Sequence, residues 1–163
     1  IDNRITANDL KKQEIQIHRE RPESMKTLEE FKPFDFSGRR IMLPVTLNNK
    51  NYEYFYDSGC SAFGLITTKK RFKKYTEQNT ELIAYGANSW GSSIPITSKL
   101  SNQSFTIGNT TLSLKRVSYV DRYTAIQPLV TPFTRIGGWL GNQPLNEHTL
   151  ILDTITKEFI IIK

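Results

Sequence analysis

From Phe34 onward, turn-forming residues divide the chain into short segments of strand length, and this division most limits the folds open to it. The segments are rich in aromatic and β-branched residues, which suit the pleated, half-buried surface of a sheet. Turn signals recur at roughly 8–12-residue spacing, as is typical of an all-β barrel or sandwich. We therefore expect a mostly β fold with one or two short helices.

The expected strands cover most of this region. Arg40–Leu47 and Tyr52–Tyr56 form a hairpin around the turn at residues 48–51. A short helix, Lys69–Tyr75, follows Thr67 and Thr68, either of which can cap it. The other expected strands are Glu81–Tyr85, Ser93–Leu100, Ser104–Ile107, Thr111–Val120, Thr149–Asp153 and Glu158–Ile162, with tight turns at Gly108-Asn109 and Thr156-Lys157.

Residues 1–33 differ from the rest of the chain. They are rich in Lys, Glu, Arg and Gln, contain no glycine, and are interrupted by proline at Pro22 and Pro33. Short helices are expected around Asn8–Gln13 and Glu23–Phe31, with Glu14–His18 extended. We interpret residues 1–33 as an N-terminal extension or linker, and residues 34–163 as one β-domain.

Composition argues against several classes of function. The net charge of +6 is modest, and the basic cluster at residues 69–74 lacks any accompanying nucleic-acid motif, so no nucleic-acid partner is expected. No apolar stretch approaches the roughly 20 residues of a membrane span. His18, His148 and the only cysteine, Cys60, are not spaced as metal ligands, so neither a metal nor a cofactor is expected.

The chemistry is concentrated where the strand Tyr52–Tyr56 runs into Asp57-Ser58-Gly59. An acid at a strand end lies where the backbone turns sharply, and glycine permits such a turn. Ser58 and Ser61 are close enough in sequence to hydrogen-bond around the carboxylate and orient it. On the triplet alone, a β-turn without function is the competing interpretation.

A second feature follows near the C-terminus. Trp139 and Leu140 precede Gly141 in a glycine-rich segment, and residues 149–162 form a closing hairpin. This order of segments resembles the retropepsin-like aspartic proteases, in particular their bacterial single-lobe members, and more distantly one lobe of a pepsin. The resemblance covers residues 34–163.

The resemblance implies a closed antiparallel β-barrel, the acid-protease lobe, and roles for particular residues. Asp57 matches the catalytic aspartate, Ser58 the hydroxyl that braces the paired active-site loops, and Gly59 the glycine packed beside the carboxylates. Cys60 stands where the family usually has alanine, serine or threonine. The segment Trp139-Leu140-Gly141 matches the one beneath the catalytic loop.

The resemblance also implies a flap that closes over substrate. The segment of this chain that matches the flap is the expected hairpin between Tyr85 and Ile96, which includes Trp90 and Gly91. A bacterial source and a periplasmic, cell-surface or secreted location rest on the resemblance alone.

The implied reaction, hydrolysis of peptide bonds by an aspartic endopeptidase, needs two carboxylates about 3 Å apart that share a proton and activate water. This chain supplies one. Asp153 is set aside, because Ile155 stands where glycine is required. The second aspartate comes either from a symmetry mate in a two-fold homodimer or from another lobe. The alternatives are a non-catalytic peptide- or partner-binding domain of the same fold, and a purely structural β-domain.

Overall fold

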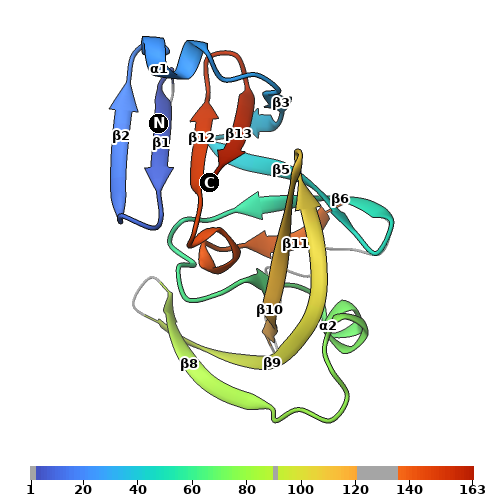
Figure 1. The fold of residues 1–163 in the computed structure, drawn as a ribbon. Coiled ribbons are helices and arrows are strands. Elements are labelled where there is room, and N and C mark those ends of the chain that lie inside the picture. The colour runs from blue at the N-terminus through green and yellow to red at the C-terminus, as the bar shows by residue number, and fades with distance from the viewer. Residues whose placement is uncertain (1–2, 90–91, 121–135) are drawn as a thin grey trace.

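The structure is a computed structural model, and it describes residues 3–89, 92–120 and 136–163. Within these residues the chain is mostly β, as expected, with helices α1 (Glu23–Lys26) and α2 (Lys69–Tyr75) and a 3-10 turn, η1 (Gln143–Leu145). The strands form one five-stranded and one eight-stranded sheet (Figure 1).

The smaller sheet joins the two ends of the chain. Figure 1 shows its blue N-terminal strands beside the red C-terminal hairpin. Residues 5–33 supply three of its five strands, so the boundary expected at residue 33 falls within this sheet. In spatial order the strands are β2 (Glu14–His18), β1 (Ile5–Asp9), β12 (Thr149–Asp153), β13 (Glu158–Ile162) and β3 (Lys32–Pro33).

The N-terminal residues are more extended than expected. The expected helix at Asn8–Gln13 is wrong, because Asn8 and Asp9 end β1 and the next residues turn into β2. Glu14–His18 is extended, as expected, and helix forms over only Glu23–Lys26 of the expected Glu23–Phe31. The physical reason is tertiary: β1 lies between β2 and β12, and both edges of its backbone are paired.

The larger sheet contains both antiparallel and parallel ladders. β11 pairs parallel with β6, and β7 pairs parallel with β10. β5 also pairs with β9, so the sheet curls back on itself. In spatial order its strands are β4 (Asp35–Ser37), β5 (Arg40–Leu47), β6 (Lys50–Tyr56), β11 (Ile136–Leu140), β7 (Leu65–Ile66), β10 (Thr110–Val120), β9 (Ser92–Ile107) and β8 (Ile83–Ser89).

The sheets do not form the expected closed antiparallel barrel. Two ladders are parallel, β4 and β8 remain as edges of the larger sheet, and five strands form the separate smaller sheet. The parallel pairing of β11 has a simple cause. β6 and β7 follow each other in the chain and run in opposite directions, so a strand inserted between them is parallel to one and antiparallel to the other.

The positions of most other elements follow the sequence. Thr68 caps α2, its hydroxyl oxygen accepting a hydrogen bond from Arg71 N at 3.3 Å. β9 is one continuous strand where two were expected. Its residues 96–107 pair with β10, and that ladder takes up an irregularity between Leu114 and Arg116 as a bulge. The elements with the expected bounds are Arg40–Leu47, Lys69–Tyr75, Thr149–Asp153 and Glu158–Ile162, whereas the strand expected at Glu81–Tyr85 begins at Ile83.

The smaller sheet packs on both faces near its centre, but its edge strand β2 extends beyond the larger sheet. We call this part of β2 the overhang. Leu150, Leu152 and Phe159 belong to the main buried cluster shared with the larger sheet. The β1–β2 register places Thr6 opposite Ile17 and Asn8 opposite Ile15, on the same face as Leu152. Ile15 and Ile17 nevertheless remain 65% exposed, so β2 extends beyond the area that the larger sheet covers.

Asp153 ties the N-terminal segment to the β12–β13 turn. Its side chain is 2% exposed, and its Oδ2 accepts a hydrogen bond from Arg21 Nε at 2.6 Å. Its Oδ1 accepts hydrogen bonds from the backbone N–H groups of Ile155 at 2.9 Å and Thr156 at 3.1 Å. Burial raises the pKa of the Asp153 carboxyl, but the bonds from Thr156 and Arg21 outweigh it and hold the pKa below its usual value. Asp153 is therefore a structural acid.

We expect Asp153→Asn to lower the free energy of unfolding by about 2 kcal/mol at pH 7, because it removes a buried charge partner of Arg21. Because the pKa of Asp153 is lower in the folded than in the unfolded chain, its carboxylate stabilises the fold fully at pH values above the unfolded pKa of about 3.9. This stabilisation is lost as the pH falls through the pKa of the folded state. Urea unfolding at neutral and acidic pH measures the difference. Asp35→Asn, at an exposed acid, is the control. An equal deficit at both pH values would contradict the assignment.

Candidate active site

Asp57 continues the ladder between β6 and β11 by one residue. Its backbone N–H donates to Leu140 O at 3.0 Å, directly after β6 ends at Tyr56. The Asp57 carboxylate is exposed but oriented by its own loop. Gly59 N donates to Oδ1 at 2.9 Å, and the Cys60 thiol donates to Oδ2 at 3.4 Å. One side of the carboxylate is thus held by the loop, and the residue remains accessible to solvent.

The glycine at the end of β11 lies directly under this loop. A Cβ on Gly141 would lie 2.1 Å from Cys60 O and 2.3 Å from Phe63 O, far inside van der Waals contact. Gly141 N also donates to Gly64 O at 3.1 Å. Only a residue without a side chain permits this approach. The loop at residues 57–64 therefore rests on Leu140 and Gly141.

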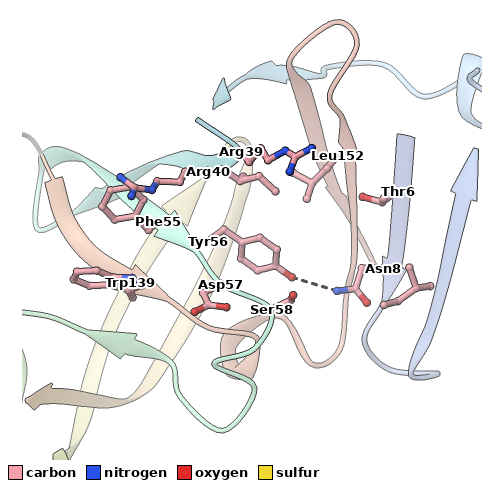
Figure 2. Close-up of a pocket in the computed structure, with 12 residues that line it drawn as sticks. Thr6, Asn8, Arg39, Arg40, Phe55, Tyr56, Asp57, Ser58, Trp139 and Leu152 are labelled. Atoms are coloured by element: carbon pink, nitrogen blue, oxygen red, sulfur yellow. Dashed lines mark hydrogen bonds between the residues drawn. The ribbon is translucent and has the colours of Figure 1, made fainter. Parts of the chain in front are cut away.

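A chain of side-chain hydrogen bonds links the Asp57 loop to the N-terminal strands. Asn142 is 9% exposed, and its Nδ2 donates to Ser58 O at 3.2 Å. Its Oδ1 accepts a hydrogen bond from Tyr56 Oη at 2.8 Å. Tyr56 Oη in turn accepts a hydrogen bond from Asn8 Nδ2 at 3.2 Å (Figure 2). Burial raises the pKa of Tyr56 to about 12, so its hydroxyl stays a donor at neutral pH. The position of Ser58 thus depends on β1.

A cavity of about 420 Å³ opens between the two sheets beside Asp57 (Figure 2). The larger sheet and its loop contribute the Asp57 side, including an aromatic pair, Phe55 and Trp139, whose ring centroids lie 5.5 Å apart. Asp57 is the only acid among the described residues that line the cavity. The lining comprises Thr6, Asn8, Ile15, Arg39, Arg40, Ile41, Phe55, Tyr56, Asp57, Ser58, Trp139 and Leu152.

The residues expected at the site fall into three groups. Asp57, Ser58 and Trp139 line the cavity, whereas Leu140 and Gly141 support the loop from below. Gly59 and Ser61 are exposed on the loop.

The flap residues are described only in part. Tyr85 lies on β8 and stacks on Phe63 of the Asp57 loop, with ring centroids 5.8 Å apart. Its hydroxyl also lies 3.1 Å from Ser98 Oγ. The expected flap residues Trp90 and Gly91 lie outside the described residues.

Sequence reasoning missed several residues that shape the site. Asn142 follows Gly141 directly, and its place beside that glycine was the only signal in the sequence, because its burial is seen only in the structure. Arg39 and Arg40 follow a turn glycine, but the chain has many basic residues and nothing marks this pair. No local signal identifies Asn8, because its partner Tyr56 lies 48 positions away.

Within the described residues, no group of three or more His, Cys, Asp and Glu side chains is placed to hold a metal ion. None of the described helices has the length and apolar character needed to cross a membrane. No model of a known protein family matches the chain, and no curated protein matches its sequence.

The Cys60 thiol serves Asp57 as a hydrogen-bond donor. Burial raises its pKa to about 12, and the charge of Asp57 and the hydrogen bond to it act in the same direction. The thiol is therefore protonated at neutral pH and unsuited to act as a nucleophile, which must be a thiolate.

We expect Asp57→Asn to lower the pKa of Cys60, because the charge opposing thiolate formation disappears. Cys60 is the only cysteine, so alkylation by iodoacetamide reports on it alone. At pH 8 the variant should react faster than the parent chain, and the pH midpoint of its rate should shift downward. Identical pH–rate profiles would show that the thiol and the carboxylate are not in contact.

We expect Gly141→Ala to destabilise the fold by about 3 kcal/mol, since its Cβ meets two backbone oxygens that belong to the Asp57 loop. Gly38→Ala is the matched control. Its Cβ meets nothing within 4 Å, and its φ of +55° leaves only left-handed strain, about 1 kcal/mol. Guanidinium unfolding of both variants gives the comparison. Equal stabilities would refute the close packing of loop and glycine.

Proposed function

We propose that this chain is an aspartic endopeptidase of the retropepsin-like type, with Asp57 as one of its two catalytic carboxylates. The observation that carries the proposal is the setting of Asp57. It is an exposed carboxylate oriented by a glycine N–H and a thiol, on a loop supported by Gly141, at the side of a cavity of about 420 Å³. Such a placement leaves an acid accessible to water and substrate while limiting its motion.

The chemistry follows from pairing Asp57 with a second aspartate. The ionised carboxylate removes a proton from a water held between the two, and the protonated partner donates to the peptide carbonyl oxygen. Water oxygen bonds to the carbonyl carbon, giving a tetrahedral intermediate. Its collapse breaks the C–N bond, and the amine leaves with a proton from the dyad. A second copy of the chain, related by a two-fold axis, or another lobe supplies the partner aspartate.

The proposed substrate is an extended peptide or protein segment. The cavity runs between strands β1 and β2 on one side and the surface around Phe55 and Asp57 on the other. β2 and β8 are edge strands of their sheets. Sheet edges present unpaired backbone groups, to which an extended peptide can add as a further strand. We assign the flap role to the β8–β9 hairpin, whose Tyr85 stacks on Phe63 of the Asp57 loop.

One observation favours the alternative, a non-catalytic peptide- or partner-binding domain. Asp57 is the only acid among the described residues lining the cavity, so these residues alone cannot form a carboxylate pair. Without a second copy or lobe, the cavity and the sheet edges remain while the hydrolytic chemistry does not.

We expect the chain to cleave members of a peptide library, with Asp57→Asn lowering the rate by at least about 100-fold, because it removes the general base. Asp35→Asn, which changes an exposed acid on β4, should leave the rate unchanged. Mass spectrometry locates the cleaved bonds, and sedimentation velocity gives the oligomeric state in the same buffers.

The outcomes separate the two functions. Cleavage by a dimer that Asp57→Asn abolishes supports the shared dyad. A folded monomer that binds peptides without cleaving them supports the binding domain. Cleavage that survives Asp57→Asn, or the absence of both binding and cleavage, rules out the proposed role of Asp57.

A further inference from the structure

We propose that the cavity beside Asp57 is a subsite for an acidic residue of an extended peptide, with Arg39 and Arg40 as its specificity-determining residues. The catalytic use of this subsite rests on the proposed function, whereas the binding preference can be measured without any cleavage.

The β4–β5 turn places both arginines at the rim of the cavity. Gly38 and Arg39 adopt consecutive left-handed conformations, with φ of +55° and +62°, and this tight turn leads directly into β5 at Arg40. Figure 2 shows Arg40 beside Phe55 and Arg39 toward Leu152, and both arginines line the cavity. The guanidinium carbon of Arg40 lies 5.9 Å from the centre of the Phe55 ring. Both residues are exposed, so a ligand entering the cavity meets them.

The charges of the cavity favour an anion. The described lining residues include two arginines and one acid, Asp57, and no lysine. A guanidinium binds a carboxylate through parallel N–H donors, and its charge persists across the physiological pH range. When Asp57 binds water and the scissile carbonyl, the two arginines are the charged groups of the described lining that can recognise a substrate side chain. A cationic side chain at the same place would be repelled.

The walls of the cavity define the neighbouring part of the ligand. Phe55, Trp139, Ile41 and Leu152 provide apolar surface, and Ile15 lines the same cavity although it is 65% exposed. Exposed isoleucine on the face of a sheet is unfavourable in water and is covered when an apolar group docks there. The ligand that fits is an extended peptide in which Asp or Glu lies close to a large apolar residue.

The test uses pairs of fluorescent peptides that contain Leu and Phe. The two members of a pair differ only by Glu or Gln at one position, and that position is moved along the peptide from pair to pair. Fluorescence anisotropy is measured with the Asp57→Asn chain, in which cleavage does not interfere, and repeated with the parent chain. We expect Glu to bind about fivefold more tightly than Gln at one position, with the preference falling as salt is raised. The double variant Arg39→Gln, Arg40→Gln should abolish it. Lys50→Gln, which removes one positive charge on the β5–β6 hairpin outside the cavity lining, should retain it.

The possible results test the acidic subsite and the proposed hydrolysis separately. A preference that persists in the double arginine variant, no preference at any position, or no binding of any peptide overturns the subsite. Cleavage by the parent chain without an acidic preference overturns the subsite and leaves the proposed hydrolysis intact. Selective binding of Glu peptides that are never cleaved leaves the subsite intact and overturns the hydrolysis.

Discussion

The insertion of β11 between β6 and β7 is the constraint on which the site depends. The sheet accepts this strand because glycines stand where side chains would collide. A Cβ on Gly137 would lie 2.1 Å from the Tyr54 ring, and one on Gly138 would lie 2.1 Å from Ile66 O. At Gly141 the same condition brings the strand end against the Asp57 loop. The backbone contacts that place the carboxylate are therefore available only if positions 137, 138 and 141 carry no side chain.

The N-terminal strands form a wall of the site and part of its support. β1 is an interior strand of the smaller sheet, between β2 and β12, and Arg21 binds the buried Asp153 of the C-terminal hairpin. From this fixed position Asn8 reaches Tyr56, and through Asn142 the same chain of bonds reaches the backbone of Ser58. A chain of partly buried, hydrogen-bonded side chains of this kind favours one arrangement, because breaking a bond leaves a partly desolvated group without that partner.

The cavity combines two kinds of chemistry that the fold brings together from distant segments. The Asp57 loop offers an accessible carboxylate, whereas the β4–β5 turn offers two permanent positive charges within the same opening. The overhang of β2 adds apolar surface in Ile15. The carboxylate suits proton transfer, while the cations and the apolar wall suit recognition. In the proposed enzyme Asp57 is one half of a dyad, so the partner that supplies the second aspartate is as much a part of that enzyme as Asp57.

Local patterns in the sequence determined the mostly β class, the strand Arg40–Leu47, the helix Lys69–Tyr75 with its Thr68 cap, and the C-terminal hairpin. They also placed Asp57 at the end of a strand, because alternation, turn residues and caps act between neighbours. Tertiary structure alone decided that residues 5–9 form a strand, that β11 is parallel to β6, and that Asn8, Arg39 and Arg40 line one cavity with Asp57. The reason is physical: strand pairing and hydrogen bonds between segments far apart in the chain stabilise these arrangements, and no local pattern encodes their partners.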